Sequence, residues 1–212
     1  MTESNSMKSG TTTVGVVCKD CIVLAADMRV TVGYQIANKN WEKVVQITDN
    51  IAITIAGSVS AIQMLEKYLK SELKLRQIRL GREVSVKEAA NLLRNWVYGM
   101  IRQPKMMQDI SHFLMAGSDS DGLHLYDIFP DGTLHKVDDY FSSGSGSHYV
   151  FGMFEQNYKP NLSEADGIEL AIQAVDTAMQ RDIASGNGIN IMVIDKNGVK
   201  KVASKKVDTH AK

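Results

Sequence analysis

Three consecutive threonines, Thr11 to Thr13, follow Gly10 at the end of the polar segment "MTESNSMKSG". A threonine hydroxyl is a weak nucleophile that needs a base, and a threonine at the N-terminus of a chain carries one in its own α-amine. That amine titrates at about pH 8, so a useful fraction is neutral at about pH 7. Thr11 would gain such an amine only if the Gly10–Thr11 bond were broken. The alternative is structural, since branched side chains suit the start of a β-strand.

Both cysteines lie in one C-x-x-C motif, at Cys18 and Cys21. This spacing is found in redox dithiols and in zinc sites. A zinc site would need two more ligands, and the sequence has no second C-x-x-C and no H-x-x-x-H. A redox motif should open a helix, whereas strand-like residues follow here. We therefore expect a hairpin that turns at Lys19–Asp20.

Other catalytic and ligand-binding motifs are absent from the sequence. There is no G-x-S-x-G nucleophile elbow, and "GSGSHYVFG" lacks the spacing of a phosphate loop. The histidines are scattered, with none spaced like a metal-binding pair: His112, His124, His135, His148 and His210. We expect no metal ion and no cofactor.

Length and charge exclude several classes of protein. A chain of 212 residues without a linker-like stretch fits one large domain. The 24 basic and 24 acidic residues give a formal net charge of zero, so we expect no nucleic-acid partner and no membrane surface. No apolar run approaches the ~20 residues of a membrane helix, and the N-terminus lacks the apolar core of a secretory signal. A cytoplasmic protein is expected.

Apolar runs and turn residues predict several β-strands in hairpins. These strands are expected within residues 11–17, 22–27, 43–58 (two strands, turning at 48–50), 110–117, 122–129, 134–144, 189–195 and 199–204. Strands and helices come in groups and do not alternate regularly. This order favours antiparallel sheets packed together with helices outside, a layered α/β sandwich.

Helical periodicity predicts three long helices. The first covers residues 58–81, with Ser58 or Ser60 as its cap. The second covers residues 85–104, where Ser85 and Glu88 form a capping box. The third covers residues 163–185, from Ser163 to a terminating Gly186. The second helix and the residues after it carry more apolar side chains than one core-facing stripe uses, which favours a contact surface there: Trp96, Tyr98, Met100, Ile101, Met106 and Met107.

The chain from residue 11 to its end resembles a proteasome β-subunit, closest in character to the archaeal type. The matching pieces occur in matching order: "TTTVGVV", "VLAADMR", "ANKNWEK", "ITIAGS", "DDYFSSGSGS" and "RDIASG". The resemblance implies an N-terminal-nucleophile hydrolase, a four-layer αββα (α+β) sandwich of two antiparallel sheets flanked by helices. It also implies that residues 1–10 are a removable propeptide, that residues 11–212 form the single domain, and that Gly10–Thr11 is the self-cleavage site.

The resemblance also implies roles for the residues of this chain that match the family's site residues. Thr11 corresponds to the nucleophile, Asp27 and Lys43 to its partners, and Gly57 to the oxyanion-hole residue. The supporting polar cluster corresponds to Ser145, Asp182 and Ser185. A lysine ammonium near Thr11 would lower the pKa of both its hydroxyl and its α-amine, and Asp27 would keep that lysine charged and oriented. Backbone N–H groups at a helix N-terminus, where Gly57 lies, favour the negative charge of a tetrahedral oxyanion.

The resemblance also implies a substrate pocket, assembly and a function. The pocket residues would be Val30, Thr31, Trp41, Val45, Ile55, Val59 and Gln63. Because none is charged, we expect cleavage of unfolded polypeptides after large apolar residues. The implied partners are proteasome α-subunits, a homo- or hetero-heptameric β-ring in a 28-subunit α7β7β7α7 particle, and a regulatory ATPase. Two alternatives remain: a catalytically silent subunit of the same fold, and a redox protein that depends on Cys18 and Cys21.

Overall fold

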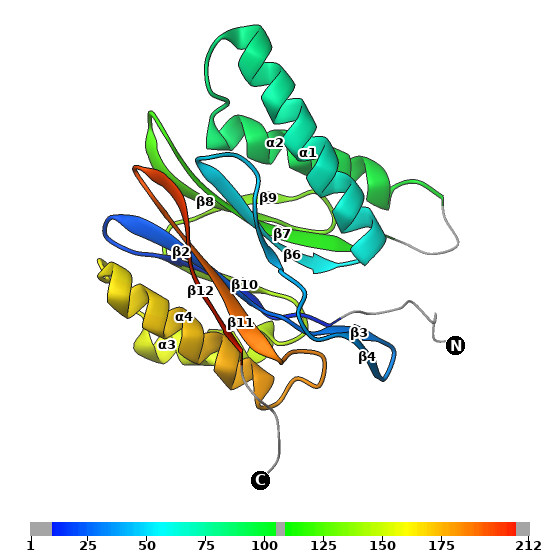
Figure 1. The fold of residues 1–212 in the computed structure, drawn as a ribbon, viewed down its shortest axis with the longest axis vertical. Helices are drawn as coiled ribbons and strands as arrows, with labels where there is room; N and C mark the ends of the chain where they lie inside the picture. The colour runs from blue at the N-terminus through cyan, green and yellow to red at the C-terminus, as the bar shows by residue number, and fades with distance from the viewer. Residues whose placement is uncertain (1–9, 105–108, 207–212) are drawn as a thin grey trace.

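The computed structural model describes residues 10–104 and 109–206. Two five-stranded antiparallel sheets stack face to face, and a pair of helices covers the outer face of each (Figure 1). This is the expected four-layer αββα sandwich. Among the described residues, no helix has the length and apolar character needed to cross a membrane.

The first sheet has the strand order β10-β1-β2-β11-β12. Its strands are β1 (Thr13–Val17), β2 (Cys21–Asp27), β10 (Tyr140–Ser143), β11 (Gly188–Asp195) and β12 (Gly198–Lys206). Every residue of β2 and β11 is buried, because helices cover one face of these strands and the second sheet covers the other. Burial on both faces explains why these two strands read as nearly continuous apolar runs.

The second sheet has the strand order β5-β6-β7-β8-β9. Its strands are β5 (Val44–Gln46), β6 (Ile51–Gly57), β7 (Ser111–Asp119), β8 (Gly122–Ile128) and β9 (Leu134–Val137). A separate hairpin of β3 (Val30–Val32) and β4 (Gln35–Asn38), which the sequence analysis missed, projects beside the sandwich (Figure 1).

Helices α1 (Val59–Leu80) and α2 (Val86–Ile101) pack on the second sheet, and α3 (Ser147–Asn157) and α4 (Glu164–Met179) pack on the first (Figure 1). The capping box of α2 is present, with Ser85 and Glu88 bonding each other's backbone N–H groups. Ser58 occupies the N-cap position of α1, but its side chain makes no capping hydrogen bond.

Two expectations about these elements were wrong, and one helix was missed. The run 134–144 is two strands, because the chain crosses from β9 in the second sheet to β10 in the first at Asp138–Asp139. The third expected helix ends at Met179, well short of residue 185, and the residues after it form a loop. Helix α3 was missed, because its glycine-rich start was considered only as a phosphate loop.

The apolar side chains of α2 do not all face outward as expected. Trp96 and Met100 are partly buried against the core of the second sheet, so the helix has a broad core-facing stripe. Tyr98 is exposed and lies under the guanidinium of Arg102, 3.5 Å from the ring centroid. Met106 and Met107 lie outside the described residues.

Candidate active site

One end of the sandwich gathers the polar residues that the sequence singled out. Thr11 lies just before β1, Asp27 ends β2, Lys43 lies just before β5, and Gly57 ends β6. These strands belong to both sheets, so the cluster lies where the two sheets meet.

Lys43 is the centre of this cluster. Its Nζ lies 2.7 Å from Asp27 Oδ1, 3.1 Å from Thr11 Oγ1 and 3.4 Å from the carbonyl oxygen of Gly10. The side chain is only 3% exposed. Burial lowers the pKa of Lys43, and the attraction of Asp27 opposes that change. The ammonium is therefore held by one carboxylate while it faces the threonine hydroxyl.

Asp27 is fully buried and well supplied with donors. Its Oδ1 accepts the backbone N–H of Thr12 at 3.0 Å as well as the Lys43 ammonium. Its Oδ2 accepts the backbone N–H groups of Arg29 at 2.9 Å and Gly186 at 3.0 Å. Three fixed backbone donors hold the carboxylate in place, so its position does not depend on Lys43 alone.

Thr11 contacts the peptide bond that precedes it. Its hydroxyl donates to the carbonyl oxygen of Gly10 at 2.7 Å, and its backbone N–H donates to Ser145 Oγ at 3.2 Å. Gly10 is confined, since an added Cβ would lie 1.8 Å from the Cβ of Ala184 and 2.8 Å from Ser145 Oγ. A larger residue at position 10 would displace the bond from the cluster.

The three residues expected as a supporting cluster lie together. Asp182 Oδ2 accepts the hydroxyls of Ser145 and Ser185, each at 2.6 Å. Ser185 Oγ in turn lies 2.7 Å from Thr12 Oγ1. The sequence analysis predicted Thr12 only as part of a β-strand. Its hydroxyl instead links the loop after α4 to the start of β1 through the hydrogen bond with Ser185.

Arg29 is a second residue whose role the sequence did not reveal. Its guanidinium donates to Asn187 Oδ1 at 2.8 Å and to the carbonyl oxygen of Ile183 at 2.7 Å. It passes directly over Gly186, where an added Cβ would lie 2.4 Å from the guanidinium. Arg29 therefore fixes the loop that supplies Asp182 and Ser185.

The backbone conformation and the close packing at position 57 both require glycine. Its φ is 121°, and an added Cβ would lie 2.1 Å from the carbonyl oxygen of Ile110. The chain just before β7 therefore approaches this glycine too closely for any side chain.

A small pocket of about 20 Å³ opens beside Thr11. Its lining includes four of the expected pocket residues, Val30, Trp41, Ile55 and Val59, and also Ile62. The other three, Thr31, Val45 and Gln63, are not among the lining residues.

Val45 packs against the core under α1 and α2, because its side chain points to the helix-covered face of the second sheet. Gln63 is exposed on α1, one position away from the inward-facing Ile62. Thr31 is buried, and its hydroxyl accepts the backbone N–H of Gly10 at 3.3 Å. The assignment of Val45, Gln63 and Thr31 to the substrate pocket stays a prediction.

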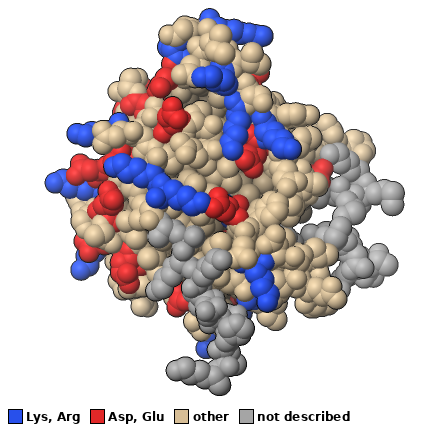
Figure 2. Space-filling view, viewed as in Figure 1, with Lys and Arg blue, Asp and Glu red and all other residues tan. Residues whose placement is uncertain are grey.

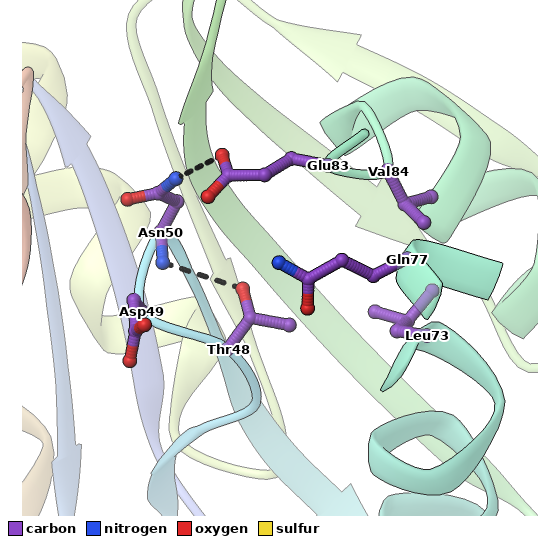
Figure 3. Close-up of a pocket in the computed structure, with 7 residues that line it drawn as sticks. All are labelled: Thr48, Asp49, Asn50, Leu73, Gln77, Glu83 and Val84. Atoms are coloured by element: carbon purple, nitrogen blue, oxygen red, sulfur yellow. Dashed lines mark hydrogen bonds between the residues drawn. The ribbon is translucent and has the colours of Figure 1, made fainter. Parts of the chain in front are cut away.

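A different pocket, of about 40 Å³, lies at the other end of β6 (Figure 3). The turn 48–50, α1 and the loop before α2 line it, and Asn50 donates to Glu83 Oε2 at 2.6 Å there. Across residues 10–104 and 109–206, no group of three or more His, Cys, Asp or Glu side chains could hold a metal ion. On the face in Figure 2, basic and acidic side chains are interspersed.

Cys18 and Cys21 are buried free thiols at the expected hairpin between β1 and β2. The backbone N–H of Cys18 donates to the carbonyl oxygen of Cys21 at 2.9 Å across the turn. This hairpin is at the opposite end of β2 from Asp27, so the thiols are remote from the polar cluster.

Two antiparallel sheets between helix pairs, with a threonine, a lysine and a carboxylate meeting at one end, define the N-terminal-nucleophile hydrolase class of fold. The model of the proteasome subunit family matches residues 7–194, and the chain belongs to this family. Family membership implies assembly into a multi-subunit proteasome particle.

Archaeal relatives cover nearly the whole chain. The proteasome subunit beta of Methanosphaera stadtmanae is 41% identical over 200 residues, which is 94% of this chain and 93% of that protein. The proteasome subunit beta of Methanococcus aeolicus is 40% identical, over 94% of this chain and 90% of that protein. That of Methanoregula boonei is 38% identical over 202 residues, which is 95% and 93% of the two chains.

Proposed function

We propose that this chain is a catalytic β-subunit of a proteasome, a threonine endopeptidase whose nucleophile is Thr11. The observation that carries the proposal is the position of the Thr11 hydroxyl, 2.7 Å from the Gly10 carbonyl oxygen and 3.1 Å from Lys43 Nζ. A hydroxyl that only began a strand would need neither contact.

Self-cleavage would begin from this arrangement. Thr11 Oγ1 attacks the carbonyl carbon of Gly10, the C–N bond breaks, and the acyl group moves to the hydroxyl as an ester. Water then hydrolyses the ester, which leaves a carboxylate on Gly10 and a free α-amine on Thr11. Residues 1–10 are thereby released as the propeptide, and residues 11–212 are the mature domain.

Peptide hydrolysis would use the same hydroxyl with the new amine as its base. The Lys43 ammonium favours the alkoxide form of Thr11, and Asp27 orients Lys43. Ser145, Asp182 and Ser185 form the polar cluster beside the Thr11 backbone nitrogen. The backbone N–H of Gly57, which lines the pocket beside Thr11, is assigned to the oxyanion.

The alternative is a silent subunit that only builds the particle. A silent chain has no reason to keep Lys43 within hydrogen-bond distance of both Thr11 and Asp27, and this chain places it so. For the active subunit we further propose a cytoplasmic location and a heptameric β-ring in an α7β7β7α7 particle. It would act with proteasome α-subunits and a regulatory ATPase on unfolded polypeptides.

Intact mass tests the proposal directly. We expect the full chain to lose the mass of residues 1–10 when it is expressed with a proteasome α-subunit, and to keep that mass when it is expressed alone if assembly is required. Peptide hydrolysis should appear together with the mass change. A chain that assembles, stays at full mass and hydrolyses no peptide would be a silent subunit.

Substrate preference follows from the lining of the pocket. Val30, Trp41, Ile55 and Val59 are uncharged, and the ammonium of Lys43, which also lines the pocket, is already paired with Asp27. A lysine or glutamate side chain would therefore lose its hydration without gaining a free counter-charge. Burial of a leucine or tyrosine contributes about 1.5–3 kcal/mol, or roughly 10- to 150-fold in kcat/KM. The pocket is small in the precursor, but Gly10 is part of its lining, so release of residues 1–10 enlarges it.

Fluorogenic peptides that differ only in the residue before the scissile bond measure this preference. We expect leucine, tyrosine and phenylalanine to be cleaved fastest. Faster cleavage after arginine or glutamate would refute the pocket assignment and leave the threonine mechanism intact.

A further inference from the structure

Asn190 is a polar residue in an otherwise apolar strand. It lies on β11, is fully buried, and alternates with Ile189 and Ile191, which face the helices. It therefore shares with Met192 the face that packs against the second sheet. Burial of an amide is costly unless its hydrogen bonds are made. An apolar side chain would stabilise this position more simply, so the amide calls for an explanation.

Within the part of the chain that the structure describes, the Asn190 side chain makes one hydrogen bond, and that bond crosses between the sheets. Oδ1 accepts the backbone N–H of Val44 at 3.1 Å. Nδ2 is buried and has no hydrogen-bond partner among the described residues. The Oδ1 atom is therefore the only polar atom of this side chain that makes a hydrogen bond among the described residues.

The bond fixes the peptide group that carries Lys43. Val44 N and the carbonyl oxygen of Lys43 belong to the same peptide unit, and that oxygen accepts the N–H of Ile55 at 2.9 Å. The unit is thus held by β6 on one side and by Asn190 on the other. Strand β5 has only three residues and pairs with β6 alone, so it has little other support.

The far end of the Lys43 side chain is fixed by the same sheet. Asp27, which binds Lys43 Nζ, lies opposite Ile189 of β11, one residue from Asn190. Residues of the first sheet therefore fix the position of both the backbone and the ammonium of Lys43, which itself lies just before a strand of the second sheet. A shift of β5 relative to β11 would move Nζ away from Thr11 Oγ1.

We propose that Asn190 is a positioning residue that fixes Lys43 relative to Thr11 through the backbone of Val44. Its effect on catalysis rests on the proposed function; its effect on the position of Lys43 does not.

Two variants and one control test this inference in the full chain, expressed under conditions in which the parent chain is processed. Asn190→Leu removes the acceptor at similar volume, and we expect kcat and the rate of self-cleavage to fall at least tenfold, with KM within threefold. Asn190→Asp keeps an oxygen for Val44 whether or not it ionises, and should remain within threefold of the parent. Met192→Ala loosens packing on the same face of β11 without removing the bond, and should leave kcat within threefold.

A second readout does not require activity. In a Thr11→Ala background, brief treatment with acetic anhydride followed by peptide mass mapping reports how accessible Lys43 is. We expect Lys43, which is 3% exposed, to be protected in the parent and in Met192→Ala, and labelled severalfold more in Asn190→Leu. Asn190→Ala is measured alongside, so that the result does not depend on one variant folding.

The inference is overturned if Asn190→Leu and Asn190→Ala match the parent in labelling and kcat, or if Met192→Ala reproduces their losses. Failure of the proposed function looks different. Thr11→Ala would then still be processed, and the labelling pattern alone would decide whether Asn190 positions Lys43.

Discussion

The Thr11→Ala variant is expected to keep residues 1–10 attached and to hydrolyse no peptide above background. The change removes the only hydroxyl that contacts the Gly10 carbonyl oxygen among the described residues. Without cleavage, no α-amine forms at position 11, so the nucleophile and its base are lost together. Intact mass and a fluorogenic peptide assay measure the two effects on the same preparation.

The neighbouring threonines supply a matched control. Thr13 is fully buried, and its hydroxyl lies 2.7 Å from Ser143 Oγ and does not contact Gly10 or Lys43. Thr13→Ala makes the same change two residues away, and should cost stability while leaving self-cleavage complete. Thr11→Ser keeps a hydroxyl and should be processed. Normal processing of Thr11→Ala would refute the self-cleavage mechanism.

Local signals in the sequence predicted the elements that depend on neighbouring residues. The capping box at Ser85 and Glu88 fixed the start of α2, since both partners lie within one turn. The hairpins of β1–β2 and β11–β12 formed where turn residues separated apolar runs. The site residues Thr11, Asp27 and Lys43 came from the family resemblance, and the strand ends that carry them meet in the structure.

Features that depend on distant partners could not be read from the sequence. Nothing in the run 134–144 shows that β9 pairs with β8 while β10 pairs with β1. The end of α4 is set partly by Asp182, whose carboxylate binds Ser145 from another element and the backbone N–H of Ala184. The role of Arg29 could not be predicted either, because its hydrogen-bond partners, Ile183 and Asn187, lie more than 150 residues away in the sequence.

Lys43→Ala is expected to fold and assemble but to lose peptide hydrolysis by about 10²–10³-fold in kcat, the range seen when one preorganised electrostatic group is removed. Loss of one partner from a buried ion pair usually destabilises strongly because a charge is left unpaired. Here Asp27 keeps three backbone donors, from Thr12, Arg29 and Gly186, so much of that cost is avoided. A fluorogenic assay measures kcat, and size-exclusion chromatography checks assembly.

The dependence on pH gives a second measure of the same lysine. Burial lowers the pKa of Lys43 below its ordinary value of 10.5; Asp27 and Asp182 oppose this shift and Arg29 adds to it. At a pH between the lowered pKa of Lys43 in the folded chain and its ordinary pKa in the unfolded chain, the unfolded chain holds a proton that the folded chain has released. In that window Lys43 therefore makes the stability of the fold rise with pH. Activity that needs the ammonium should fall over the same range. Lys43→Ala should lack this rise in stability.

Replacement of either partner of the ion pair should have distinguishable results. Lys43→Arg keeps the charge, but a guanidinium is larger and planar, and the site gives Nζ three close oxygens with almost no exposed surface. We therefore expect only partial recovery of kcat. Asp27→Ala should instead lower stability by about 3–5 kcal/mol, because it leaves Lys43 buried without its counter-charge and three backbone N–H groups without an acceptor. Thermal denaturation separates the two cases. Near-normal turnover in Lys43→Ala, with the fold intact, would show that Lys43 has a structural role and does not tune Thr11.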